Sequence, residues 1–328
     1  MKMKSRFLLL ISLFSLLMFF SVSAQTETVE LVGKIDADAH VSRMVWNETG
    51  DNLTLVSRDS VQRFAAAPDS DVSSYSFGGK TYFFSTVSEA GKAAMLSDDT
   101  STIYIYDLDS PEKDVKTITP GFRMLSVSVS KDGSQVLADS AEQIRSVIFD
   151  AEDGTVLHDL SGFTTAAPVY DSTLSADGSR VVWHSRGTFA VQSIADGSLG
   201  ETISLWDFAS AYELSPDNSL LAVSIVNDDY ENGAVFFFDP LSGEEKGRTL
   251  LEKPAPHELS FSDDGSVLWA ADNENVYAID PKTFESVSQV KIGEKEGDNR
   301  ITRIASSPDG SSAAVLKNSG EIYLVDMK

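Results

Sequence analysis

A short motif that recurs seven times predicts a β-propeller, a closed ring of seven blades with four antiparallel strands each. The motif is an apolar stretch, a turn whose clearest form is Ser-x-Asp-Gly, and a second apolar stretch. Its copies follow one another at spacings of 40 to 47 residues, the repeat length of one propeller blade. The turn residues are, in order, Gly50, Gly91, Gly133, Gly178, Asn218, Gly265 and Gly310. The copies fill the chain and leave no room for a second large domain.

The copy that begins at Pro256 illustrates how one blade is built. Leu259 and Phe261 alternate with polar neighbours, as in a half-buried strand. Gly265 completes a hairpin turn, because glycine takes a positive φ without steric cost. Three more strands are expected at residues 267–271, 276–279 and 287–292. Each copy therefore predicts a four-stranded antiparallel meander.

Two further positions recur in the copies and have structural explanations. An apolar residue stands four positions before most turns and is expected to pack one blade against the next: Trp46, Val87, Val129, Leu174, Leu214 and Phe261. An aspartate ends most third strands and is expected to cap the turn into the outer strand: Asp107, Asp150, Asp239, Asp280 and Asp326. Five aspartates at symmetric, separated positions do not form a catalytic group.

The two ends of the repeat region predict how the ring closes. The seventh copy stops after its third strand, whereas an additional strand, Thr28–Ile35, precedes the first copy. Pairing this strand with Ile322–Val325 completes the last blade and removes two open sheet edges. Val29, Leu31 and Ile35 are expected to share its buried face.

The first residues have the pattern of a secretory signal peptide, expected to span residues 1–24. Basic residues precede an uncharged apolar run at 7–20, and small residues lead up to Ala24. We expect cleavage before Gln25, a propeller domain over residues 25–328, and an exported protein that is periplasmic or secreted, most simply in a bacterial envelope. The run is short for a membrane span, so none is expected after cleavage.

The composition narrows the function further. The chain has no cysteine, which excludes disulfides, thiolate metal sites and thiol nucleophiles. Its formal charge of −24 repels nucleic acids and anionic membranes, so neither is an expected partner. The charge favours cationic partners or serves solubility alone.

The turn Ser307-Pro308-Asp309-Gly310 and the strands that end in aspartate resemble WD40-type propeller repeats. The copy from Pro256, with the strand 276–280 ending in Asp-Pro, is more similar to the YVTN-type repeats of exported bacterial propellers. The resemblance covers nearly all of residues 28–328. The Gly-His dipeptide of strict WD40 repeats is missing, and no third strand ends in Trp-Asp. It implies an architecture rather than an activity.

Motifs for cofactors and catalysis are missing from the sequence. The four histidines, His40, His158, His184 and His257, show no metal-ligand spacing. There is no Gly-x-Ser-x-Gly nucleophile elbow and no glycine-rich phosphate loop. The acidic segment 227–233 lacks the ligand spacing of a calcium loop and is expected to be solvated. No cofactor or metal is therefore expected.

The residues that differ between copies are the candidates for a site. Seven positions before the turn residues stand Arg43, Phe84, Ser126, Asp171, Ala211, Glu258 and Arg303. These open the innermost strands, so their side chains are expected around the mouth of the central channel. The predicted ligand- or partner-binding residues are His40, Arg43, Arg123, Asp171, His257, Glu258, Arg300 and Arg303. The alternative is that arginine–carboxylate pairs merely fill the channel.

Two functions remain open on these grounds. The first is a monomeric binding or scaffold module that presents one propeller face to a protein or a small ligand. The second is a lactonase-like hydrolase, an activity found among similar seven-bladed propellers. The resemblance implies a cluster of histidine, arginine and carboxylate groups for it, and His257, Arg303 and Glu258 are the nearest candidates. The fold alone does not decide between them.

Overall fold

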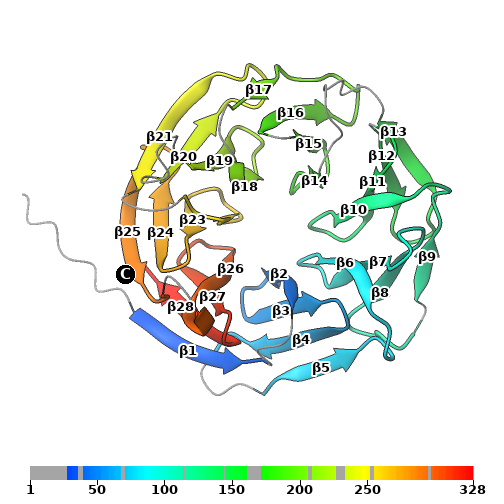
Figure 1. Cartoon of the computed structure of the whole chain (residues 1–328), viewed down its shortest axis with the longest axis horizontal. Coiled ribbons are helices and arrows are strands. Elements are labelled where there is room, and N and C mark those ends of the chain that lie inside the picture. Colours follow the sequence, from blue (N-terminus) through cyan, green and yellow to red (C-terminus); the bar gives the residue numbers. More distant parts are fainter. Residues whose placement is uncertain are drawn as a thin grey trace, which may run out of the picture.

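The chain forms the ring that the repeats predict (Figure 1). A computed structural model describes residues 28–35, 40–67, 71–113, 115–143, 145–160, 171–185, 187–205, 209–226, 233–251, 255–294 and 297–327. These residues form seven sheets of four antiparallel strands each, which confirms the predicted fold class. The predicted signal segment and most of the acidic segment 227–233 lie outside the described residues.

The strands run from the channel outward in each of the first six blades, and each blade follows the previous one around the ring. Blade 1 contains β2 (Val41–Trp46), β3 (Asn52–Ser57), β4 (Ser60–Ala65) and β5 (Ser73–Ser76). Blade 2 contains β6 (Tyr82–Val87), β7 (Lys92–Ser97), β8 (Ile103–Asp107) and β9 (Lys116–Ile118). Blade 3 contains β10 (Met124–Val129), β11 (Gln135–Ser140), β12 (Ser146–Asp150) and β13 (Val156–Leu160).

The second half of the ring repeats this order. Blade 4 contains β14 (Asp171–Leu174), β15 (Arg180–Ser185), β16 (Thr188–Ser193) and β17 (Ile203–Ser204). Blade 5 contains β18 (Ala209–Leu214), β19 (Leu221–Val226), β20 (Gly233–Phe238) and β21 (Glu245–Leu251). Blade 6 contains β22 (Glu258–Phe261), β23 (Leu268–Ala271), β24 (Asn275–Asp280) and β25 (Glu285–Lys291). After the short 3₁₀ helix η1 (Gly297–Asn299), blade 7 contains β26 (Ile301–Ser306), β27 (Ser312–Lys317), β28 (Glu321–Asp326) and β1 (Thr28–Lys34).

The seven inner hairpins turn at the residues that the repeats predict. All seven turn residues, Asn218 included, have φ between 59° and 77°, the left-handed region. Glycine enters this region freely, and asparagine is among the few other residues that tolerate it. The turn chemistry therefore explains why the motif tolerates so little variation here.

The N-terminal strand closes the ring, as predicted. β1 pairs antiparallel with β28, with Thr28 opposite Asp326. The Thr28 hydroxyl donates a hydrogen bond of 2.9 Å to the Asp326 carboxylate. In the other blades with an aspartate at the end of the third strand, that aspartate accepts a backbone N–H two residues further on, at 2.7 to 3.0 Å. The capping role predicted for these aspartates is confirmed, and in blade 7 the same position binds the closing strand.

The predicted buried face of the closing strand is wrong. Val29 and Leu31 are 43% and 49% exposed, whereas Val32 and Ile35 are 1% and 7% exposed. The pairing register shifts between Leu31 and Gly33. This bulge interrupts the period of two, so the residues before it and after it do not follow one alternation.

The core of the described ring lies between the blades rather than at its centre. Its buried apolar side chains form seven clusters, each from two neighbouring blades. The cluster between blades 7 and 1 joins Val32 of the closing strand to Trp46, whose indole N–H donates to the carbonyl of Ala305 at 2.9 Å. The apolar residues predicted between the blades are buried, except that Val129 is partly buried.

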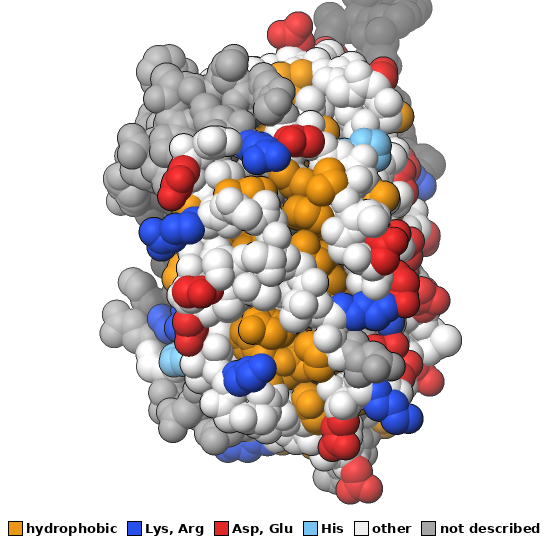
Figure 2. Space-filling view, turned by 90° about the vertical axis from the view of Figure 1, so that its right-hand side faces the viewer, with side chains coloured by type: hydrophobic (Ala, Val, Ile, Leu, Met, Phe, Trp, Pro, Cys, Tyr) orange, Lys and Arg blue, Asp and Glu red, His pale blue; other side chains and the backbone are white. Residues whose placement is uncertain are grey.

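One side of the outer wall shows no single gathering of charged groups (Figure 2). Figure 2 shows the wall on the side of β9 and β13, where apolar and charged side chains are interspersed. Val156 and Leu157 of β13 are exposed. Among the described residues, no helical segment has the length and hydrophobicity that a membrane crossing requires. The convergent polar side chains lie in the channel.

Candidate functional site in the central channel

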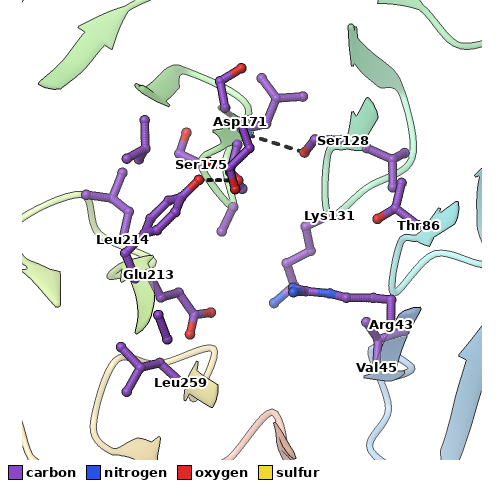
Figure 3. Close-up of a pocket in the computed structure, with 18 of the residues that line it drawn as sticks. Arg43, Val45, Thr86, Ser128, Lys131, Asp171, Ser175, Glu213, Leu214 and Leu259 are labelled. Carbon is purple, nitrogen blue, oxygen red and sulfur yellow. Dashed lines mark hydrogen bonds between the residues drawn. The ribbon is translucent and has the colours of Figure 1, made fainter. Parts of the chain in front are cut away.

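The innermost strands surround a central cavity of about 470 Å³ (Figure 3). Blades 1 to 6 contribute side chains to its wall. A smaller hollow of about 230 Å³, lined mainly from blades 1, 6 and 7, shares Arg43, Glu213 and Glu258 with it. Because the two have wall residues in common, we call them together the lumen.

Five of the eight predicted site residues line the lumen. These are Arg43, Asp171, His257, Glu258 and Arg303. The seven residues that stand seven positions before the turns all line it too. Their role in binding stays a prediction.

The other three predicted residues lie apart from the lumen. His40, Arg123 and Arg300 are exposed and do not belong to the described lining of either hollow. The Arg123 side chain donates instead to the Thr100 hydroxyl at 3.3 Å. Each stands one position before its innermost strand, as the lumen-lining His257 does, so this position alone does not place a side chain in the channel.

Glu258 and Arg303 form an ion pair of 3.1 Å between blades 6 and 7. Arg303 also donates to the carbonyl of Ser42, at 3.2 Å, and so ties blade 1 to the pair. Burial raises the pKa of Glu258, and Arg303 opposes that rise. Nε2 of His257 donates to the Ile301 carbonyl, 3.2 Å away, and burial lowers the pKa of this histidine. This part of the lumen is a junction between blades.

A second set of paired groups lies in blade 4. Asp171 Oδ1 lies 3.0 Å from Nδ1 of His184. The Gly187 backbone N–H points at the other ring nitrogen, at 3.4 Å, and the ring stacks on Phe189 with centroids 4.6 Å apart. Both nitrogens of His184 are therefore occupied, and the ring is fixed in place.

Behind this wall, a buried aspartate joins blades 3 and 4. Asp139 is 2% exposed and accepts hydrogen bonds from the hydroxyls of Ser126, Ser146 and Ser172. The backbone N–H of Ser172 donates to it at 2.8 Å. Burial raises the pKa of Asp139, and these hydrogen bonds oppose the rise. The network holds the innermost strands of the two blades in register.

The turn end of the channel is crossed by a salt-bridged lysine. Lys131, in the inner hairpin of blade 3, forms ion pairs with Glu89 of blade 2, at 3.2 Å, and with Asp263 of blade 6. Blades 3 and 6 lie on opposite sides of the ring (Figure 1), so this contact spans the channel. Burial alone lowers the pKa of Lys131, but its two carboxylate partners outweigh that effect and raise it. Burial raises the pKa of Glu89 to about 7, although Lys131 opposes it.

Glu213 of β18 is a carboxyl group that keeps its proton at neutral pH. Burial raises its pKa to about 8 and the charges of Glu258 and Glu89 add to the rise, although Arg43 opposes it. The Phe261 backbone N–H donates to Oε2 of Glu213 at 3.0 Å. No hydrogen bond from the described residues reaches the other oxygen, Oε1.

Arg43 of β2 faces Glu213 across the lumen (Figure 3). Among the described residues its guanidinium has no ion-pair or hydrogen-bond partner. The other charged side chains of the lumen each have a partner from this part of the chain. Arg43 is therefore a cation directed into an open cavity without a counter-ion at contact distance.

The sequence prediction missed Glu213, Lys131, Glu89, Asp263 and His184. A comparison of the seven copies, position by position, would have indicated two of these five residues. Five positions before the turn, Glu213 is the one ionisable residue among valine, threonine, serine and alanine. Two positions before the turn residue, Lys131 is the one basic residue among the seven copies. That Lys131 pairs across the channel is not visible in a sequence, because blades 3 and 6 are not neighbours.

The described residues contain no group of three or more histidine, aspartate or glutamate side chains that could hold a metal ion. No protein-family model matches this chain, and no curated protein matches it. The fold and the lumen therefore carry the functional argument alone.

Proposed function

We propose that this chain is an exported, monomeric binding protein whose propeller presents one end of its channel to a small ligand or a protein partner. The observation that carries the proposal is Arg43, an arginine that has no partner among the described residues and lines a cavity of about 470 Å³. Arg43 is exposed at the cavity wall, so water solvates its charge there until a ligand with a negative charge takes that place. A cavity of this size is in the range of small-molecule sites.

The two ends of the channel support access from one side. Lys131 and its carboxylate partners span the turn end. At the other end, where the innermost strands begin, Phe83 and Phe84 are 46% and 38% exposed. Exposed aromatic side chains beside polar groups are typical of binding surfaces.

The lumen chemistry favours binding over hydrolysis. A lactonase-like site requires a free base and an electrophilic group that converge on one point. Glu258 and Arg303 are paired with each other, and both nitrogens of His184 are occupied. His257 is neutral and bound to a backbone carbonyl through one ring nitrogen.

A lumen-filling variant tests the binding proposal. Ala211 lines the cavity, so Ala211→Trp should abolish the binding of small-molecule fragments detected by saturation-transfer NMR. Ser74→Trp, on the exposed outer strand β5, is the matched control and should bind the same fragments as the unmodified protein. Melting curves of both variants separate loss of binding from loss of fold. Fragments that bind the Ala211→Trp variant unchanged would place the site elsewhere.

An enzyme assay tests the alternative directly. The purified protein should not hydrolyse a panel of aliphatic lactones and aryl esters above the uncatalysed rate. Hydrolysis that is lost in Glu258→Gln would overturn the binding proposal in favour of a lactonase-like enzyme.

Export is the part of the proposal that rests on sequence alone. The basic, apolar and small-residue series up to Ala24 supports cleavage before Gln25. Intact mass measurement of the exported protein should give a chain that begins at or near Gln25. A soluble exported form that retains Met1 would contradict this.

A further inference from the structure

We propose, on the basis of the binding function above, that the lumen binds a monocarboxylate. Arg43 on one wall would bind the carboxylate, and Glu213 on the facing wall would donate a hydrogen bond to it. The geometry points to this because both side chains reach into the same cavity from opposite sides and do not contact each other (Figure 3).

The ion pairs of the lumen leave one cation, Arg43, without a partner at contact distance among the described residues. The other charged groups of the lumen are committed within the described chain: Asp171 to His184, Glu258 to Arg303, and Glu89 and Asp263 to Lys131. Arg43 is left over. A guanidinium matches a carboxylate in a planar, two-point hydrogen-bonded pair.

Glu213 supplies the second contact. Its Oε2 accepts the Phe261 N–H, which leaves Oε1 to carry the proton and to donate it to an anion. The groups that act on this carboxyl are Arg43, Glu258, Glu89 and the Phe261 amide, and its raised pKa keeps the proton in place at neutral pH. A deprotonated Glu213 would repel the same ligand.

The wall around the two groups limits the ligand further. Val45, Phe84 and Leu259 line the cavity together with hydroxyl groups, so a carboxylate with a small apolar body fits it. Arg43, which has no ion-pair partner among the described residues, offers the ligand one positive charge, whereas the dianion of phosphate would meet additional repulsion in a chain of charge −24.

The test uses phenylacetate as the probe, titrated into the mature protein by calorimetry. Phenylacetamide has the same shape without the charge, phenethylamine has the opposite charge, and inorganic phosphate is a dianion. Phenylacetate should bind at least about tenfold more tightly than the other three, because a hydrogen bond to a charged group is worth about a factor of ten to a hundred.

Two variants assign the contacts. Arg43→Ala, and the better-folding substitute Arg43→Gln, should weaken phenylacetate binding about tenfold to a hundredfold. Arg123→Ala, which removes an exposed arginine outside the lumen, should not. Between pH 7 and pH 9 the unmodified protein should lose about tenfold in affinity as Glu213, with a pKa of about 8, gives up its proton. Glu213→Gln, which cannot titrate, should reduce this pH dependence to the part that Glu89, with a pKa of about 7, contributes.

The outcomes separate this inference from the binding function. Tighter binding of phenethylamine than of phenylacetate, or equal binding of phenylacetamide, would overturn the monocarboxylate inference while a ligand-binding lumen stands. Failure of all four probes to bind would overturn it as well, and the lumen-filling experiment would then judge the binding function independently. A pH dependence as large in Glu213→Gln as in the unmodified protein would remove Glu213 from the site.

Discussion

The seven blades resemble one another closely at the turn end of the channel and differ from one another along the lumen wall. At the turn end, five hairpins have the same aspartate and the same hydrogen bonds: Asp132, Asp177, Asp217, Asp264 and Asp309. Each accepts a serine hydroxyl at 2.6 to 2.8 Å and a backbone N–H at 2.8 to 3.0 Å. The lumen wall is the opposite case, since its seven equivalent positions hold arginine, phenylalanine, serine, aspartate, alanine and glutamate.

This difference separates what builds the ring from what makes it specific. A repeated hydrogen bond serves each blade in the same way, so it explains the fold and cannot distinguish one ligand from another. An unrepeated side chain breaks the symmetry of the ring and gives the lumen a direction, from Arg43 on one wall to Glu213 on the other. Changes in the first group should affect stability, and changes in the second should affect binding.

The largest expected effect comes from removing the closing strand. Deletion of residues 28–35 exposes the edge of β28 and the apolar groups under Val32 and Ile35. Each of these two side chains contributes about 1.5–3 kcal/mol by its burial, against a total stability of about 5–15 kcal/mol for a domain. We expect aggregation or a fall of many degrees in the melting temperature, measured by circular dichroism.

A matched pair of point variants tests the corrected face of this strand. Val32→Ser should destabilise the protein by about 2 kcal/mol or more, because Val32 is 1% exposed. Val29→Ser, in the same strand but 43% exposed, should change stability by less than about 0.5 kcal/mol. Equal urea midpoints for the two variants would mean that the strand does not bury Val32.

The next largest effect is expected at Lys131, which occurs in only one of the seven copies but lies at the turn end of the channel, where most copies are alike. Lys131→Met leaves Glu89 and Asp263, both partly buried, without their cation. We expect a loss of about 1–3 kcal/mol, the cost of leaving such groups unpaired. Lys116→Met is the control, because it removes a lysine paired with the 80% exposed side chain of Glu152 and should cost less than about 1 kcal/mol. Urea unfolding of both variants measures the difference. An equal cost would show that the ion pairs of Lys131 with Glu89 and Asp263 do not stabilise the fold.

The sequence predicted the repeated parts of the molecule well because each depends on local chemistry. A left-handed turn selects glycine or asparagine, and an aspartate before a turn finds the N–H two residues on. The error in the closing strand came from a bulge between Leu31 and Gly33, which depends on the strand it pairs with. A period of two in the sequence does not reveal such a shift.

The site could be predicted only in outline. The residues that open the innermost strands do line the lumen, because their position follows from the repeat. Which charges neutralise one another depends on how the ring places its blades. Lys131 meets Asp263 and Glu258 meets Arg303, whereas Arg43 has no partner in the part of the chain that the structure describes. Long side chains reach several ångströms from their backbones, so position along a strand does not identify the partner.

A smaller effect tests the turn residues themselves. Gly310 has a φ of +71°, and a Cβ atom there would lie 3.0 Å from the Ser262 Cβ. Gly265 has a similar φ of +68°, but its Cβ would meet only Pro216, at 3.8 Å. Both alanine variants should lose roughly 1 kcal/mol from the unfavourable φ, and Gly310→Ala should lose more because of the crowding. Thermal melts that rank the variants in the reverse order would contradict this explanation.

The smallest expected effect is a change in how the free energy of unfolding depends on pH. It distinguishes the lumen wall from the turn end of the channel most directly. Glu213 holds its proton in the folded chain up to a pH of about 8, whereas a glutamate of ordinary pKa 4.5 has released it. Between these values the folded state binds more protons than the unfolded state, so this group's stabilisation, complete below pH 4.5, is lost as the pH rises towards 8. The turn aspartates behave in the opposite way: hydrogen bonds lower the pKa of Asp177 despite its burial, so its contribution is lost only in acid, below its ordinary pKa of 3.8.

Glu213→Gln should therefore flatten the decline of the urea midpoint between pH 5 and pH 9, and Asp177→Asn should leave that decline unchanged. We expect the difference to stay below about 1 kcal/mol per pH unit, because one full proton corresponds to about 1.4 kcal/mol per unit and Glu213 remains partly open to the lumen. Glu89, whose pKa burial raises to about 7, contributes a similar slope that ends nearer neutrality and survives in the Glu213 variant. If Glu213→Gln and the unmodified protein show the same decline, Glu213 is ionised in the folded chain. In that case Arg43 faces a carboxylate rather than a neutral acid, and the lumen would favour a zwitterion over a simple anion.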